Sequence, residues 1–178
     1  MTNLCRFELP GRGLVSFDGV PRQPRTELSD GIFHVTARGM PEHPLFVDDH
    51  DRSRFVSLLR ELAPQHGVRC RAYCVMGTHY HLLLDGSAVD LASLMKRLNG
   101  RYARRYNERH DRHGHVFAER YSAWVVRDER HLEQAYAYID ANPVKAGLCE
   151  SGDRWPWTWI GDRDAGPEVV AARKAGTG

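Results

Sequence analysis

The spacing of hydrophobic residues between positions 31 and 142 switches repeatedly between the two periods of regular secondary structure, and this succession constrains the fold more than any other feature. Alternating or continuous apolar runs bounded by glycine and proline predict four strands, at 31–38, 68–76, 79–85 and 117–126. Apolar residues three or four positions apart predict three helices, at about 49–65, at about 90–109, and from about 129 to no further than 142. The last limit comes from Pro143, because a proline disfavours helical geometry in the residue before it.

The order of these elements is strand, helix, strand, strand, helix, strand, helix. Only Gly77 and Thr78 separate the second strand from the third, so these two strands should form an antiparallel hairpin. With antiparallel pairing, the order predicts an α+β fold of the split β-α-β type, an antiparallel sheet with its helices packed on one face.

The length of 178 residues, with 42% hydrophobic residues, is enough for one domain with its own core, and we expect that domain at residues 30–160. Residues 1–29 hold several prolines and glycines and a basic stretch at 21–25. They predict a poorly ordered basic lead-in, with a short strand near 13–17. Residues 161–178 show no periodicity and predict a disordered tail.

The chain contains no apolar run of 18 residues, and its first residues lack the basic start and apolar core of a secretory signal. We therefore expect a cytoplasmic protein with no membrane partner and with reduced cysteines. Cys70 and Cys74 lie at even spacing on a predicted strand and so on one face. They are either buried strand residues or a zinc pair with His79.

His79 and His81 are separated by one residue at the start of an apolar strand. Because side chains alternate along a strand, both imidazoles should point to the same face. Two neighbouring neutral imidazoles can chelate a divalent cation, although two exposed histidines without any ligand would show the same pattern. A metal-binding histidine also needs a partner for its other ring nitrogen, and the sequence does not identify one.

Tyr138 and Asn142 are four residues apart on the last predicted helix and so share a face. The amide oxygen of Asn142 can bind a hard cation, and the phenol of Tyr138 can act as a covalent nucleophile when a base or a cation activates it. The same spacing also fits a packing tyrosine followed by a helix terminator before Pro143.

Five groups of residues, in order along the chain, form a framework that covers about residues 30–160. They are Phe33-His34-Val35-Thr36-Ala37-Arg38-Gly39; His79-Tyr80-His81-Leu82-Leu83; Leu94-Met95-Lys96-Arg97-Leu98-Asn99 with Tyr102 and Tyr106-Asn107; Gly114-His115-Val116-Phe117 with Arg120-Tyr121; and Tyr138-Ile139-Asp140-Ala141-Asn142-Pro143-Val144-Lys145-Ala146-Gly147. In these residues the chain resembles the single-tyrosine transposases of the HUH superfamily, in particular their REP-associated branch.

The resemblance implies a ferredoxin-like core and an enzyme that nicks and rejoins single-stranded DNA at hairpin-forming repeats through a 5′-phosphotyrosine intermediate. It implies that His79, His81 and Asn142 hold a magnesium or manganese ion and that Tyr138 is the nucleophile. Basic side chains, which could also be merely solvated, would contact the phosphates of the DNA. These residues are Lys96, Arg97, Arg101, Arg104, Arg105, Arg112 and Arg120.

The chain departs from the family pattern at Gly77-Thr78, where relatives usually have Pro-Asn before the first histidine, and this difference affects the expected orientation of the His79 side chain.

Two other functions fit the residues: a catalytically decayed module that binds hairpin DNA or RNA, and a metal-dependent nuclease that uses water as its nucleophile. REP-associated enzymes are thought to act as monomers, whereas related insertion-sequence enzymes exchange tyrosine helices in dimers. We expect a monomer rather than a homodimer, associated with the nucleoid.

Overall fold

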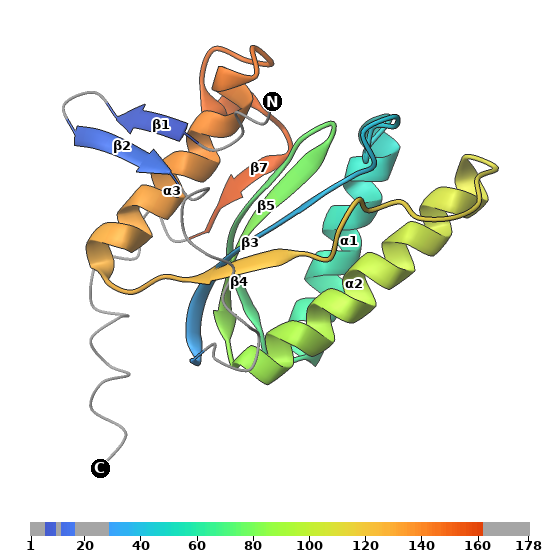
Figure 1. The fold of residues 1–178 in the computed structure, drawn as a ribbon, viewed down its shortest axis with the longest axis horizontal. Helices are drawn as coiled ribbons and strands as arrows, with labels where there is room; N and C mark the ends of the chain where they lie inside the picture. Colours follow the sequence, from blue (N-terminus) through green and yellow to red (C-terminus); the bar gives the residue numbers. More distant parts are fainter. Residues whose placement is uncertain (1–5, 10–11, 17–28, 162–178) are drawn as a thin grey trace.

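The computed structural model describes residues 6–9, 12–16 and 29–161 (Figure 1). Its elements are β1 (Arg6–Leu9), β2 (Arg12–Ser16), β3 (Gly31–Arg38), α1 (Asp49–Gln65), β4 (Arg69–Val75), β5 (His79–Gly86), α2 (Ala88–Arg109), β6 (Ser122–Val125), α3 (Glu129–Lys145), the 3-10 turn η2 (Gly152–Arg154) and β7 (Thr158–Ile160). Strands β1 and β2 pair as a two-stranded antiparallel sheet, so the strand expected near 13–17 is present. The remainder of the predicted lead-in, and residues 162–178 of the predicted tail, lie outside the described residues.

The main sheet has the strand order β6-β3-β5-β4-β7, and all its pairings are antiparallel. The four neighbouring strands β6, β3, β5 and β4 have the order that a split β-α-β unit requires, with β3 and β5 side by side in the middle. These two strands pair along their whole length, from Gly31 opposite Gly86 to Arg38 opposite His79. The predicted α+β class and antiparallel sheet are confirmed.

The helices differ from the prediction in one respect, because they cover both faces of the sheet (Figure 1). Helices α1 and α2 pack on one face, over a core that includes Phe33, Val35, Leu82 and Leu84. Helix α3 packs on the opposite face, where it contributes Leu132, Ala135 and Ile139 to a smaller core with Ala72, Cys74, Met76 and Leu83. The physical reason is the apolar character of β4 and β5 on both faces, since each face must be covered to exclude water.

Helix α3 also extends past Asn142 to Lys145, with Pro143 inside it, so the predicted end is wrong by three residues. Pro143 lies in the last turn of the helix, where a missing N–H removes one hydrogen bond close to the end. The helix continues because the backbone N–H of Ala146 still donates to the carbonyl of Asn142, at 3.1 Å. Pro143 is itself buried, which adds apolar contact.

Cys70 and Cys74 lie on opposite faces, contrary to the prediction from their spacing. Cys70 packs against the core beneath α1 and α2, whereas Cys74 belongs to the core beneath α3. The cause is an irregularity in the pairing of β4 with β5 between Cys70 and Ala72, which shifts the alternation by one residue. The two thiols therefore do not form a zinc pair with His79.

Two further elements differ from their predicted extent. Strand β6 begins only at Ser122, and the earlier part of the predicted strand contributes an isolated bridge between Gly39 and Phe117. The segment that follows α3 adds β7 to the edge of the sheet, where Thr158 lies opposite Cys74. No helix in the described part of the chain is long and apolar enough to cross a membrane.

Candidate metal and nucleophile site

The candidate site lies on the face of the sheet that α3 covers. His79 and His81 are on β5 and point to this face together, with ring centroids 5.1 Å apart. A third histidine, His34 on β3, lies beside them, and its Nε2 is 3.1 Å from Nδ1 of His81. His34 and His81 are fully buried, whereas His79 is partly exposed at the end of the strand.

Helix α3 places Tyr138 against these histidines. Leu132, Ala135 and Ile139 anchor the helix to the sheet, and Tyr138 is buried with them. Its ring meets the ring of His81 edge-on, with centroids 5.1 Å apart, and lies 5.5 Å from that of His34. The structure therefore brings the predicted nucleophile and the predicted metal-binding strand together within one chain.

Asn142 lies one turn further along α3, in the last part of the helix. Its side-chain Nδ2 donates a hydrogen bond to the carbonyl of Tyr138, at 2.8 Å. This bond orients the amide and leaves Oδ1 as the atom suited to bind a cation. Lys145 lies on the same helix, with Nζ 5.6 Å from the centre of the Tyr138 ring.

The environment keeps all three imidazoles neutral near pH 7. Burial lowers the pKa of His79 to about 4, and repulsion by Arg38 contributes. Burial lowers the pKa of His34 to about 3, with a smaller effect of His131. For His81, burial and then the two neighbouring imidazoles lower the pKa well below its ordinary value. Neutral imidazoles retain the lone pair that metal ligation needs.

Each of the two predicted histidine ligands has its Nδ1 engaged in a hydrogen bond. Nδ1 of His79 is 3.0 Å from the hydroxyl oxygen of Thr78, and Nδ1 of His81 bonds to His34. Nε2 of His81 is buried and has no hydrogen-bond partner among the described residues. A buried polar atom without a partner is costly, and a bound cation would satisfy it. The residues therefore fit a divalent ion.

The turn before His79 is well defined despite the Gly77-Thr78 departure. The backbone carbonyl of Gly77 accepts a hydrogen bond from the backbone N–H of Phe46, and that of Thr78 accepts one from the backbone N–H of Gly39, both at 2.9 Å.

The described residues contain no group of three His, Cys, Asp or Glu side chains arranged to hold a metal. A three-ligand site on this strand therefore depends on an amide ligand, as predicted for Asn142.

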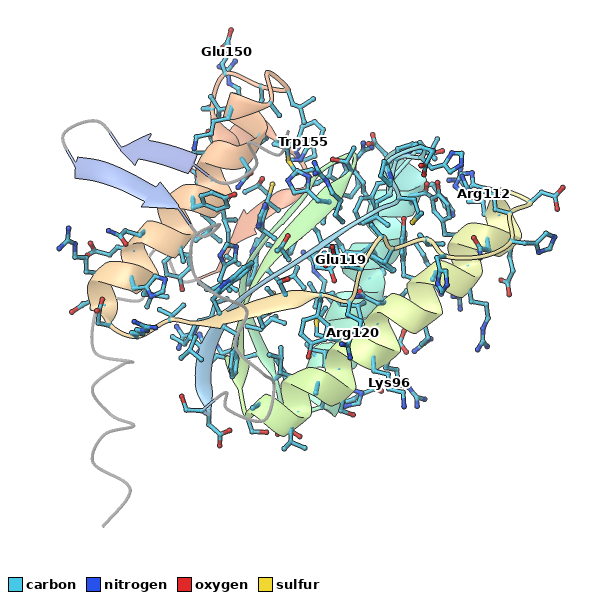
Figure 2. The ribbon with its side chains drawn as sticks, in the orientation of Figure 1. Lys96, Arg112, Glu119, Arg120, Glu150 and Trp155 are labelled. Atoms are coloured by element: carbon cyan, nitrogen blue, oxygen red, sulfur yellow. The ribbon has the colours of Figure 1, made fainter. Side chains whose placement is uncertain are left out.

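The predicted DNA contacts lie apart from this site. Lys96, Arg97, Arg101, Arg104 and Arg105 belong to α2, and so to the layer on the other face of the sheet (Figure 1). Lys96, Arg97, Arg101 and Arg104 line a groove of about 650 Å³. Lys96 and Arg120 line a second cavity of about 850 Å³ between α2 and residues 114–121. Arg112 lies near the C-terminal end of α2 (Figure 2).

Arg101 is engaged within the protein. Arg101 forms an ion pair with Glu61 of α1, at 2.7 Å. Its guanidinium is therefore less available to DNA than those of Arg97 and Arg104, which are exposed.

Sequence reasoning gave no role in the site to His34 or Thr78. His34 was visible as part of a motif, but it is 47 residues from His81 along the chain, so spacing alone cannot pair them. The detectable signal was the alternation of β3, which places His34 and Thr36 on one face of a strand expected in the same sheet as His81.

Comparison with known proteins supplies relatives for this arrangement. Residues 28–142 match the family model described as "Transposase IS200 like". A protein of Haemophilus influenzae assigned as a REP-associated tyrosine transposase is 24% identical over 152 residues, which cover 75% of this chain and 86% of that protein.

One solved structure shows the same fold. A REP-associated tyrosine transposase bound to a REP hairpin superposes with a TM-score of 0.58 and 17% identity, over 74% of this chain and 77% of that one. A crystal structure of a protein assigned as a transposase from Deinococcus radiodurans gives a TM-score of 0.46 and 23% identity, over 66% and 94% of the two chains.

Proposed function

Because the chain belongs to the IS200-like transposase family, we propose that it nicks and rejoins single-stranded DNA at hairpin-forming repeats, with Tyr138 as the nucleophile. The 5′ end of the cut strand would stay on the protein as a phosphotyrosine until it is rejoined. We propose residues 30–160 as the domain that performs this reaction.

The observation that carries this proposal is the contact between Tyr138 of α3 and His81 of β5. A tyrosine that served only for packing would be expected among apolar side chains. Tyr138 instead presents its ring to two imidazoles, those of His81 and His34. Asn142 is held to the Tyr138 carbonyl by its side chain, which ties the proposed third ligand to the nucleophile.

We propose His79, His81 and Asn142 as the ligands of a magnesium or manganese ion. When bound, such an ion would polarise the scissile phosphate and stabilise the charge of the in-line transition state. The Tyr138 oxygen, having lost its proton, would form a bond to phosphorus while the bond from phosphorus to the 3′ oxygen breaks. The 3′ oxygen would take up a proton and leave as a hydroxyl. Attack by a 3′ hydroxyl would reverse these steps, and no ATP is needed because one phosphate ester replaces another.

Hairpin DNA is the proposed partner. Support comes from the solved relative that was bound to a REP hairpin, and from the basic side chains that line the groove on α2. The protein would act as a monomer, since one chain brings its own Tyr138 to its own His81 and needs no exchange of helices.

The test is covalent capture of the cut strand. The purified protein is incubated with single-stranded hairpin oligonucleotides labelled at the 3′ end and with Mn²⁺ or Mg²⁺, and the products are separated on a denaturing gel. We expect a labelled protein adduct that is lost in Tyr138→Phe and kept in Tyr136→Phe, which alters a tyrosine two residues earlier on α3.

The two alternatives give different results in the same experiment. Cleavage without an adduct, unaffected by Tyr138→Phe, would identify a nuclease that uses water. A shifted hairpin band on a native gel, with neither cleavage nor adduct, would identify a binding module. Either result would refute the proposed chemistry.

A further inference from the structure

Beneath the proposed metal site, two buried histidines share one hydrogen bond. Nε2 of His34 and Nδ1 of His81 are 3.1 Å apart, and the two residues are 1% and 2% exposed. Both rings are neutral, so one nitrogen of this pair must donate the proton and the other must accept it. The two possible arrangements differ in where the proton of His81 lies.

The proposed metal site distinguishes these arrangements, because a cation can bind His81 only at a nitrogen that carries no proton. If His34 donated, the proton of His81 would lie on Nε2, which is buried and has no acceptor among the described residues. If His81 donates from Nδ1, its Nε2 keeps a lone pair directed away from His34. The second arrangement only moves the buried N–H from Nε2 of His81 to Nδ1 of His34. It alone, however, leaves a nitrogen of His81 that can bind a metal.

We infer that His34 is a positioning residue, which accepts the Nδ1 proton of His81 and so holds the Nε2 lone pair of His81 ready for the cation. The inference rests on the proposed function, because it gives His34 a purpose only if His81 binds a metal. It supplies the partner that a metal-binding histidine needs and that the sequence did not identify.

The fold keeps His34 in place for this task. The pairing of β3 with β5 sets Thr36 opposite His81 and Leu83 opposite His34, so the two histidines are diagonal neighbours on one face. Tyr138 and Trp124 contact the ring of His34 from α3 and from β6, with centroids 5.5 and 6.0 Å away. Packing from two elements therefore restricts the rotation of the ring.

Thr78 makes a comparable contact with His79, but in a different environment. The hydroxyl oxygen is 3.0 Å from Nδ1 of His79, and the bond is exposed. Water can replace an exposed partner, whereas nothing can replace a buried one without a cost. We therefore expect His34 to matter much more than Thr78.

The direct test is the position of the proton on His81 in the metal-free protein. The full chain is labelled with ¹⁵N-histidine, treated with a chelator, and studied by long-range ¹H–¹⁵N correlation spectra, which distinguish the two tautomers. We expect His81 to carry its proton on Nδ1. His34→Phe keeps an aromatic ring but removes the acceptor, and in this variant we expect His81 to lose its preference for the Nδ1 form, so that both tautomers are populated. His34→Gln keeps an acceptor oxygen and should restore the Nδ1 form.

Metal affinity provides the second readout. Mn²⁺ binding is measured by titration calorimetry without DNA. We expect His34→Phe to weaken it by about 10- to 100-fold, the usual effect of losing such a partner. His34→Gln should recover most of the loss, and Thr78→Val should change the affinity by less than about threefold. Leu83→Ala serves as the matched control, because it removes a buried side chain from the same face and lowers the melting temperature without altering the tautomer.

Two results would overturn the inference: a proton on Nε2 of His81 in the unaltered protein, or unchanged Mn²⁺ affinity in a folded His34→Phe variant. These outcomes are separate from the fate of the proposed function. An Nδ1 proton that depends on His34, in a protein that forms no DNA adduct, would support the role of His34 and refute the nicking chemistry. Adduct formation with an Nε2 proton on His81 would support the nicking chemistry and refute the role of His34.

Discussion

Asn142 is the residue at which the choice of metal can be tested most directly. Imidazole nitrogens suit Mn²⁺ better than Mg²⁺, which prefers oxygen, so the amide oxygen is the proposed ligand that favours Mg²⁺. We predict that Asn142→Leu weakens Mn²⁺ binding by at least about tenfold, because a directly bound ligand matters no less than an outer partner. Asn142→Asp should retain the adduct and improve activity in Mg²⁺ relative to Mn²⁺. Calorimetry and the covalent assay in each metal measure both effects, and equal affinity in the Leu variant would exclude Asn142 as a ligand.

The buried histidines predict how the stability of the metal-free protein depends on pH. Their pKa values in the folded protein, about 3 for His34 and about 4 for His79, lie below the value of about 6.5 for an unfolded chain. Below pH 6.5 the unfolded chain therefore binds more protons, and the free energy of unfolding falls as the pH falls from 6.5 toward 4. The upper limit is on the order of 1.4 kcal/mol per pH unit for each group.

Urea unfolding in the presence of a chelator, at several pH values between 7.5 and 5, measures this slope. The slope should be smaller in His34→Phe, since one of the depressed groups is gone. A slope equal to that of the unaltered protein would show that His34 does not contribute to the pH dependence of the free energy of unfolding.

Among the elements, α1 and α2 are joined by ion pairs that differ in burial. Asp51 of α1 is 3% exposed and accepts hydrogen bonds from Arg109 at 2.6 Å and from the backbone N–H of Val47 at 3.0 Å. Glu61, at the other end of α1, pairs with Arg101 in an exposed position. We predict that Asp51→Ala lowers the free energy of unfolding by about 1 to 3 kcal/mol, because the Val47 N–H and the partly buried His110 lose their acceptor, whereas Arg109 keeps its hydrogen bonds to Asp48.

Glu61→Ala is the matched control, since it removes a carboxylate that joins the same two helices. Its cost should stay below about 1 kcal/mol, as is usual for exposed pairs. Urea unfolding at pH 7 measures both variants. Equal losses would show that burial does not decide the contribution of these ion pairs.

The elements also show what sequence periodicity can and cannot predict. The helix expected at about 49–65 and the strand expected at 31–38 match α1 and β3, because each has a strong repeat and a clear boundary. Strand β7 was missed because three residues within a tryptophan-rich segment carry no period. Its place comes from tertiary contacts instead, such as the hydrogen bond from Trp155 to the carbonyl of Val75.

The same distinction applies to the site. His79 and His81 form a local pattern, as do Tyr138 and Asn142, so sequence could predict that each pair shares a face. Their meeting across β5 and α3 depends on which face of the sheet α3 covers, and the element order did not determine this. His34 reaches the site only through the pairing of β3 with β5, a relation between distant parts of the chain.

For the whole molecule, α2 lies on the other face of the sheet from the candidate site, so we expect substitutions on α2 to change DNA affinity without changing metal affinity. Arg97 and Arg104 line the groove on α2, on the other side of the sheet from Tyr138. We predict that the double variant Arg97→Ala, Arg104→Ala weakens binding of a hairpin oligonucleotide and lowers the slope of log affinity against log salt by about two, one for each lost phosphate contact. Mn²⁺ affinity should not change.

Fluorescence anisotropy over a range of salt concentrations measures the slope. Arg154→Ala is the control, because it removes an exposed arginine that pairs with Glu150 far from α2. Arg101→Ala should have a smaller effect than Arg104→Ala, since Glu61 already competes for Arg101. An unchanged slope in the double variant would place the phosphate contacts elsewhere.

If α2 binds the DNA and Tyr138 cuts it, as proposed, the placement of these two helices on opposite faces of one sheet sets a lower limit on the length of the substrate. A DNA strand that touches the outer side of α2 and also reaches Tyr138 on α3 must pass around the edge of the sheet, and a helix alone is about 10 Å wide. At about 3.4 Å per stacked base, at least about three nucleotides must separate the anchored part from the bond to be cut. An oligonucleotide trimmed below that reach would still bind through its stem while its cleavage point stayed out of contact with Tyr138.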